Sequence, residues 1–366
     1  MITEKTSRTL MVANLIAMCL IISIHYNTGD YTETNETLLG WNYLTQEFLV
    51  NGLARCAVPY FALMSGFFLF SQFSRHRSYK KLLKSRFHTL MLPYLLSATI
   101  IFLSLALIDL WKGNLSFLNI KTILYGIFIS PLSGQFWFLR DLCFLVAVSP
   151  LLLPKNRILQ CTLGLCLFSL WALELQIAPM AGQWHIVNVE TLFFFYLGGQ
   201  LSSRSAILNA VVDSNIKTVA ATCLLLLVIL TTRIYIDPTV DLWYKEARNY
   251  TLLPLLFYKA TIVFGMICLI RISAFFHENT RLVYLSGLTF FAFLFHFEPL
   301  IRLITWLTYM IVAKEFGFYL SFPAATVTVF TIAHLIARYL PRLYEILCGG
   351  RNPQKAFKRI RPRRTD

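Results

Sequence analysis

Six ionisable residues interrupt long apolar stretches of the sequence and are the first candidates for chemistry. They are His25, Arg55, Arg140, Asp141, His296 and Glu298. Ionisable side chains are costly inside membrane-spanning segments, so they usually face a cavity or pair with one another. A histidine exchanges a proton near neutral pH, and a fixed cation can stabilise a developing negative charge. The set therefore suggests a polar site within an otherwise apolar protein.

A polar track along one helix is indicated by Asn14 and His25. These residues are eleven positions apart in the stretch NLIAMCLIISIH. In an α-helix this spacing is about three turns, roughly 20° from eclipsed and ~16 Å along the axis. Both side chains are therefore expected on one face, Asn14 deep and His25 near the outer end.

Long apolar helices are the elements that must position these residues. The chain has 366 residues, of which 57% are hydrophobic and 14% are charged, whereas soluble proteins are nearer half apolar and a quarter charged. The apolar residues gather in blocks long enough to cross ~30 Å of hydrocarbon as helices. The predicted spans are 9–26, 53–72, 87–110, 136–153, 158–178, 189–203, 216–236, 252–272, 284–305 and 319–340. The sequence thus predicts an all-α polytopic membrane protein with about ten transmembrane helices.

The distribution of Lys and Arg predicts the direction of each span. With the N-terminus inside, the inner connections hold 23 basic residues and the outer loops hold six. The positive-inside rule then places both termini in the cytoplasm. The same rule accounts for the net charge of +15, so no nucleic-acid partner is expected. In this orientation the six ionisable residues come from four helices to one outer depth, which favours a polar cavity over separate interfacial anchors and ion pairs.

Other parts of the chain receive simpler interpretations. Arg233, Lys259 and His185 are interpreted as anchors or loop residues, and Glu47 is assigned to an outer loop at 27–52. Residues 1–345 are expected to form one transmembrane domain. Residues 346–366 are expected to form a basic cytoplasmic tail near anionic headgroups. The eight cysteines show no metal-ligand spacing, so no metal site is predicted.

One inner loop is unusually basic. The stretch SRHRSYKKLLKSRFHTLMLPYLL carries Arg75, Arg77, Lys80, Lys81, Lys84 and Arg86. Two interpretations fit these charges. They follow the positive-inside rule and only orient the helices, or they hold the phosphates of a nucleotide-like ligand. The sequence has no glycine-rich phosphate loop, no H-E-x-x-H and no G-x-S-x-G motif. Ser65–Gly66 is interpreted as a small-residue contact between helices.

Several stretches follow one another in a recognisable order. They are IISIH, RCAVPYFALMSGFFLF, KKLLKSRFHTLMLPYLL, FWFLRDLCFLVAVSPLL, FFFYLGG and SGLTFFAFLFHFEPL. Together they resemble the acyltransferase-3 family of integral membrane O-acyltransferases over nearly the whole chain. The most specific match is the second stretch, which is similar to the family's Arg-x-x-x-Pro-aromatic-aromatic…Ser-Gly helix.

The resemblance implies acyl transfer from a cytoplasmic acyl-CoA, commonly acetyl-CoA, to a hydroxyl of a sugar. The acceptor would be a cell-surface or lipid-linked glycan, and the protein would lie in the cell inner membrane, in contact with the lipid bilayer. Acetyl-CoA would be a co-substrate, and no bound cofactor is expected. In this chemistry a histidine takes the proton of the sugar hydroxyl as it attacks the thioester. Whether His25 acts as this base or as a transient acyl carrier stays open.

The resemblance also assigns site residues. His25 matches the family's first-helix histidine, Arg55 its second-helix arginine, and Arg86 the basic residue before Leu-Pro-Tyr. The predicted catalytic residues are His25, Arg55, Arg140 and His296. The predicted residues for the sugar substrate are Asn14, Asp141 and Glu298. The predicted residues for acyl-CoA are Lys81, Lys84 and Arg86.

Asn14 departs from the family pattern. The family commonly has Arg or Lys at this position, eleven residues before the histidine, and an amide supplies no charge. Another cation, such as Arg140, would then take over, or the acyl donor would bind differently.

Two other classes of protein fit the same spans. A transporter or flippase of a glycan or lipid-linked sugar would also need buried polar groups, although the inverted repeats and paired broken helices typical of transporters are not evident. A structural membrane subunit would tolerate alanine throughout the polar cluster. Dependence on acyl-CoA separates the transferase from the transporter.

Overall fold

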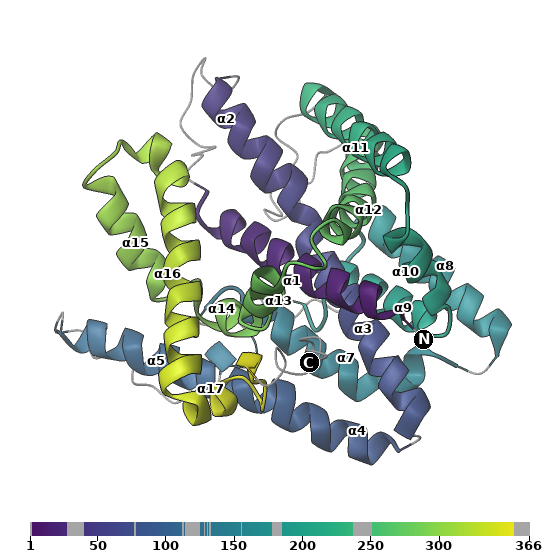
Figure 1. The fold of residues 1–366 in the computed structure, drawn as a ribbon, viewed down its shortest axis with the longest axis horizontal. Coiled ribbons are helices and arrows are strands. Elements are labelled where there is room, and N and C mark those ends of the chain that lie inside the picture. The colour runs from purple at the N-terminus through teal and green to yellow at the C-terminus, as the bar shows by residue number, and fades with distance from the viewer. Residues whose placement is uncertain are drawn as a thin grey trace, which may run out of the picture.

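The computed structural model describes residues 2–27, 40–76, 78–111, 113, 125–127, 129, 131, 133–154, 156–177, 185–236 and 251–354. Helices form the regular structure of these residues (Figure 1). The first half contains α1 (Glu4–His25), α2 (Trp41–Gln46), η1 (Glu47–Gly52), η2 (Leu53–Cys56), α3 (Ala57–His76), α4 (Tyr79–Arg86), η3 (Phe87–Met91), α5 (Leu92–Trp111), α7 (Phe136–Leu152) and α8 (Arg157–Ala172). The second half contains α9 (Val189–Ser202), α10 (Ser205–Val212), α11 (Ile216–Ile236), α12 (Leu252–Ala274), α13 (Thr280–Ser286), α14 (Thr289–Phe295), α15 (Leu300–Tyr309), η6 (Lys314–Phe316), α16 (Gly317–Tyr339) and α17 (Pro341–Leu347).

Several of these helices are long and apolar enough to cross a membrane. Among the described residues, six helical stretches pass this test, and α14 with α15 makes a seventh if the bent pair counts as one span. Three further predicted blocks, 136–153, 158–178 and 189–203, correspond to α7, α8 and α9. These helices have 17, 16 and 14 residues and are shorter than the six stretches that pass the test. The predicted helical architecture is confirmed for the described residues, and the six or seven candidate spans agree with a multi-pass membrane protein, while the count of ten spans and the side of the termini stay predictions.

The second predicted span begins earlier than the hydropathy pattern indicates. One helical stretch runs from Trp41 to Phe73 and includes the π-helical turn η1. Glu47 lies in that turn and is 1% exposed, so its assignment to an outer loop is wrong. The carboxylate tolerates burial because Arg233 on α11 pairs with it.

Two glycines allow α3 and α9 to cross at backbone contact. A Cβ on Gly66 would lie 2.0 Å from the carbonyl oxygen of Phe195, and a Cβ on Gly198 would lie 1.9 Å from that of Leu63. No side chain larger than hydrogen fits at either position. The interpretation of Ser65–Gly66 as a small-residue helix contact is confirmed.

The ninth predicted span, 284–305, is broken. α14 ends at Phe295, α15 begins at Leu300, and the two axes differ by 75°. Pro299 stands in the break, where its lack of an N–H interrupts helical hydrogen bonding. The prediction of one continuous helix is therefore wrong, and the break places His296 at the end of α14 inside the protein.

Candidate active site

The end of α1 and the break between α14 and α15 bring two predicted site residues together. The ring centroids of His25 and His296 are 5.2 Å apart, and the ring of Phe297 is 4.6 Å from that of His25. The hydroxyl of Tyr26 donates a hydrogen bond to the carbonyl of His296 at 3.0 Å. The junction is thus held by the residue that follows His25.

Hydrogen bonding fixes the proton of His296 on one nitrogen. Its Nδ1 lies 3.0 Å from the carbonyl oxygen of Phe293 and 3.1 Å from that of Ala292. A carbonyl oxygen only accepts, so Nδ1 carries the proton and the neutral ring keeps a lone pair on Nε2. Within the described part of the chain, this buried Nε2 has no hydrogen-bond partner. His296 is therefore placed to accept a proton beside His25.

A chain of buried polar side chains positions Arg55. Its Nε donates to Oδ1 of Asn51 at 3.1 Å, and its Nη2 donates to the same oxygen. Nδ2 of Asn51 donates to Glu47 at 2.7 Å. Arg233, which is fully buried, donates from Nη2 to the other oxygen of Glu47 at 2.7 Å. The chain holds Arg55 where it interacts electrostatically with His25.

Arg233 and Lys259 are not the anchors that the sequence suggested. Arg233 belongs to the chain that holds Arg55. Lys259 is 4% exposed and binds Glu174 at 2.5 Å, with Glu190 at 3.7 Å. The indole nitrogen of Trp171 donates to Glu190 at 2.9 Å. Both cations tolerate burial because carboxylates from other segments neutralise them. Their position inside or at the edge of apolar blocks was the signal that could have found them.

Arg140 and Asp141 join neighbouring segments to α7. Nη2 of Arg140 lies 3.0 Å from Asp141 and donates to the carbonyl of His185 at 2.9 Å, while its Nη1 donates to the carbonyl of Ile129 at 2.6 Å. The other oxygen of Asp141 accepts the backbone N–H of Asn188 at 2.7 Å. These contacts hold the pair in place against neighbouring segments, and the roles of Arg140 in catalysis and of Asp141 in sugar binding stay predictions.

Glu298 lies in the break between α14 and α15 and follows His296 closely in the chain. Its carboxylate accepts a hydrogen bond from Nε of Arg302, one turn along α15, at 2.8 Å. The structure thus places Glu298 in the break and pairs it with an arginine of the helix that follows. In the described residues, no three His, Cys, Asp or Glu side chains gather as a metal site.

A cavity of about 340 Å³ lies next to α1, which contributes Asn14 to its lining. Its polar lining residues are Asn14, Ser65, Arg86, Thr289 and Arg351. Most of the remaining wall is apolar and comes from Phe61, Met64, Phe68, Leu69, Leu90, Phe138, Leu139, Leu142, Val146, Phe195, Phe290 and Phe293. Phe293 links the two regions, because it lines the cavity and its ring lies 6.0 Å from that of His296.

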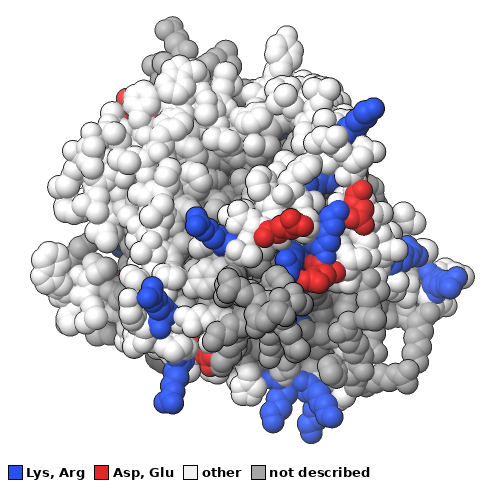
Figure 2. Space-filling view, in the orientation of Figure 1, with Lys and Arg blue, Asp and Glu red and all other residues white. Residues whose placement is uncertain are grey.

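A basic groove of about 460 Å³ adjoins this cavity. Lys80, Lys84 and Arg86 line the groove, and Arg86 also lines the cavity. Lys81 is exposed on α4 and belongs to neither lining. Lys and Arg side chains gather over α4 at the lower edge of the molecule in Figure 2. Two of the three residues predicted to bind acyl-CoA, Lys84 and Arg86, therefore share one groove.

Comparison with known proteins shows the family of the chain. Residues 12–338 match the family model described as an acyltransferase domain. The chain belongs to the acyltransferase-3 family. This acyltransferase is also similar to the succinoglycan biosynthesis protein ExoH of Rhizobium meliloti (strain 1021), with 24% identity over 360 residues, 93% of this chain and 92% of the relative. No solved structure matches the chain. The histidine pair lies within the matched region of the acyltransferase, whereas Arg351 lies beyond it.

Proposed function

We propose that this protein is a membrane O-acyltransferase that moves an acyl group, in the simplest case acetyl, from cytoplasmic acyl-CoA to a sugar hydroxyl. The observation that carries the proposal is the histidine pair, next to a cavity that shares Phe293 with the surroundings of His296 and Arg86 with the basic groove. The acceptor is a sugar of a cell-surface or lipid-linked glycan. Similarity to a protein named for succinoglycan biosynthesis supports a polysaccharide acceptor.

The proposed topology has ten spans in the inner membrane, with both termini in the cytoplasm. The basic residues of α4 support this orientation, since inner connections carry the excess of Lys and Arg. Acyl-CoA then reaches the groove of Lys84 and Arg86 from the cytoplasm. The histidine pair lies near the opposite end of α1, where a sugar arrives from outside.

The proposed reaction is a direct acyl transfer. The sugar hydroxyl gives its proton to a histidine nitrogen while its oxygen forms a bond to the thioester carbonyl carbon. Arg55 stabilises the negative charge that develops on the carbonyl oxygen. The C–S bond then breaks, CoA leaves as a thiolate, and the proton held by the histidine passes to its sulfur. The lone pair on Nε2 of His296 suits the first step, and an acyl-imidazole trapped on His25 would show a covalent route instead.

The acyl donor has two parts that match two regions of the protein. Its phosphates suit the groove of Lys80, Lys84 and Arg86, because ammonium and guanidinium groups form charge-assisted hydrogen bonds to phosphate. Its uncharged arm suits the apolar cavity that contains Asn14. The thioester would then arrive near Phe293, next to His296.

The proposal is tested in cells that lack this protein and are complemented with variants. Surface glycan O-acetyl groups are measured for wild type, His25→Ala and His277→Ala, at equal membrane levels. His277 is the matched control because it follows α12, away from the site. We expect wild type and His277→Ala to restore the ester and His25→Ala to restore none. Equal restoration by all three proteins would contradict the proposed role of His25.

A glycan transporter is the second candidate, and the broken helix at α14 and α15 favours it. Transporters use discontinuous helices to bind substrate within the membrane. The same cells distinguish the two functions. Loss of the whole glycan from the surface, with unchanged acetylation of what remains, would indicate transport.

A further inference from the structure

The chain reverses direction after α17 and returns to the cavity. Gly349 and Gly350 have φ values of 63° and 79°, in the left-handed region. The N–H of Gly350 donates to the carbonyl of Glu345 at 2.7 Å, and that of Gly349 donates to the carbonyl of Ile346 at 3.4 Å. This is a Schellman turn, which ends a helix and redirects the chain. The turn places Arg351 against η3, which contains Thr89.

Residues 349–354, which we name the C-terminal strap, are fastened along their length. A Cβ on Gly349 would lie 2.7 Å from Cα of Thr89, and a Cβ on Gly287 would lie 2.9 Å from Pro353. The amide of Asn352 donates to the carboxylate of Glu345 at 2.6 Å. The remainder of the predicted tail, 355–366, lies outside the described residues.

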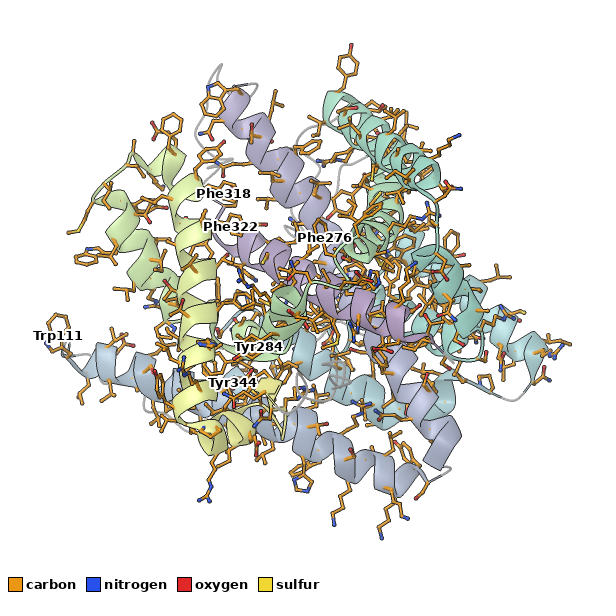
Figure 3. The ribbon with its side chains drawn as sticks, viewed as in Figure 1. Trp111, Phe276, Tyr284, Phe318, Phe322 and Tyr344 are labelled. Carbon is orange, nitrogen blue, oxygen red and sulfur yellow. The ribbon has the colours of Figure 1, made fainter. Side chains whose placement is uncertain are left out.

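α17 holds the start of the strap in place. Tyr344, labelled in Figure 3, donates its hydroxyl to the carbonyl of Gly287 at 3.1 Å and stacks on Phe291 at 5.7 Å. α17 also packs on α5 and α16, beside α5 in Figure 1. The position of Arg351 is therefore set by packing and not by a loose tail.

Arg351 is held in the wall of the cavity. Its Nη1 donates to the carbonyls of Thr89 at 2.7 Å and Cys348 at 2.8 Å. Its guanidinium carbon lies 3.9 Å from the centre of the Phe290 ring. Burial lowers the pKa of Arg351 to about 10, so the group is charged at neutral pH. The strap thus adds a second fixed positive charge, beside that of Arg86, to a cavity whose lining is mostly apolar.

The charge of the cavity lining is unbalanced. Arg86 and Arg351 both line it, and no carboxylate is among the described lining residues. Arg86 donates from Nη2 to Gln72 at 2.8 Å, while its buried Nε has no partner among the described residues. Asn14 lines the same cavity with a neutral amide. Arg86 and Arg351 are half-buried, and two such guanidinium groups of like charge in one cavity are stabilised by an anion that lies between them.

We propose that Arg351 is a donor-binding residue that holds, together with Arg86, a phosphate of the acyl donor. The ligand class is an acyl thioester with an uncharged arm that is joined at its far end to phosphate or pyrophosphate. This assignment rests on the proposed acyl transfer and adds to it a charge from the C-terminal strap, outside the region that matches the family.

Binding of acetyl-CoA to the purified full-length protein tests the assignment. The variants are Arg351→Ala, Arg351→Lys and the control Arg342→Ala, an exposed arginine of α17. Loss of one charged phosphate contact predicts a Kd for acetyl-CoA that is roughly 10- to 100-fold weaker in Arg351→Ala. Arg351→Lys recovers part of this loss, and Arg342→Ala binds as wild type does. In the transfer assay, Arg351→Ala raises KM for acetyl-CoA and leaves kcat within about twofold.

A second ligand separates recognition from folding. Acetyl-pantetheine has the same thioester and arm but no phosphate, so its weak affinity is expected to be equal in wild type and Arg351→Ala. If Arg351→Ala binds acetyl-CoA as tightly as wild type, or loses both ligands equally, the assignment is overturned and Arg351 is only a structural contact. If wild type binds no acetyl-CoA, the proposed function fails, and the assignment fails with it.

Discussion

Single residues determine which atoms of this site can carry out chemistry. The two carbonyl groups at Nδ1 of His296 leave Nε2 as the basic atom. His25 supplies a second imidazole 5.2 Å away, centroid to centroid. Arg55 is held nearby through Asn51, Glu47 and Arg233. A proton acceptor and a fixed cation therefore occur together, as attack on a thioester requires.

The lone pair of His296 leads to a prediction at this scale. In His296→Asn the side-chain NH₂ can still donate to the carbonyl of Phe293, but the basic Nε2 is gone. Loss of a general base lowers kcat by roughly 10²- to 10⁴-fold, while KM for acetyl-CoA is expected to be unchanged. Transfer to a sugar acceptor by the purified protein measures both constants.

His277→Asn is the matched control for this substitution. Nδ1 of His277 likewise donates to a backbone carbonyl, that of Ala274, at 2.7 Å. His277 itself lies outside the site. Its kcat should equal that of wild type. If His296→Asn kept more than half of the wild-type kcat, the proton-accepting role would be refuted.

At the scale of elements, irregular helical turns carry the site. The π-helical turn η1 holds Glu47 and Asn51, and η3 follows Arg86 and contains Thr89, which accepts from Arg351. Such turns are rare and frequently occur at functional sites. The break between α14 and α15 places His296 in the same way.

The crossing of α3 and α9 leads to a prediction about stability. Gly198→Ala would place Cβ 1.9 Å from a backbone oxygen of Leu63, which cannot rotate away. Overpacking of this kind destabilises by about 3 kcal/mol, so the purified variant should unfold at a clearly lower temperature. Activity should fall with it, because α3 continues from the turn that carries Arg55.

Gly164→Ala on α8 is the control for steric fit. The added Cβ would meet only the movable ring of Tyr196, at 3.3 Å. Its unfolding temperature should stay close to that of wild type. Equal unfolding temperatures for the two variants would show that the α3–α9 contact can open, contrary to the tight crossing in the structure.

At the scale of the whole molecule, the cavity and the histidine pair lie at different depths along α1. The cavity that Asn14 lines adjoins the groove of Lys84 and Arg86, and the histidine pair stands at the end of α1. Helix geometry separates Asn14 and His25 by ~16 Å. In the proposed topology the donor thus enters from the cytoplasm and the acceptor from outside, so the membrane keeps the two substrates apart until they meet.

This topology predicts opposite reactivity of two engineered cysteines. Lys81→Cys on α4 should react with a membrane-impermeant maleimide only from the cytoplasmic side, and Lys314→Cys in η6 only from the outer side. The measurement uses right-side-out and inside-out vesicles, in a protein whose exposed Cys161 and Cys166 are replaced by serine. Labelling of both positions from one side would contradict the proposed orientation.

The local sequence determined the helical, multi-pass architecture and several candidate site residues. Hydropathy identified the apolar blocks because each block is a continuous stretch of chain. The order of short motifs indicated the acyltransferase-3 family, and Arg86 was recognised because it precedes Leu-Pro-Tyr. His25 was singled out by its place at the end of the first apolar block, and the structure puts it beside His296.

Only the tertiary structure decided which polar groups meet. Glu47 and Arg233 are 186 residues apart in the chain and form one buried ion pair. Arg351 and Thr89 are 262 residues apart, yet their hydrogen bond places a tail residue in the cavity wall. Helix periodicity fixes which residues share a face, but it carries no information on which distant helix packs against that face. The same limit applies to the break at Pro299, whose direction is set by packing and which turns His296 toward His25.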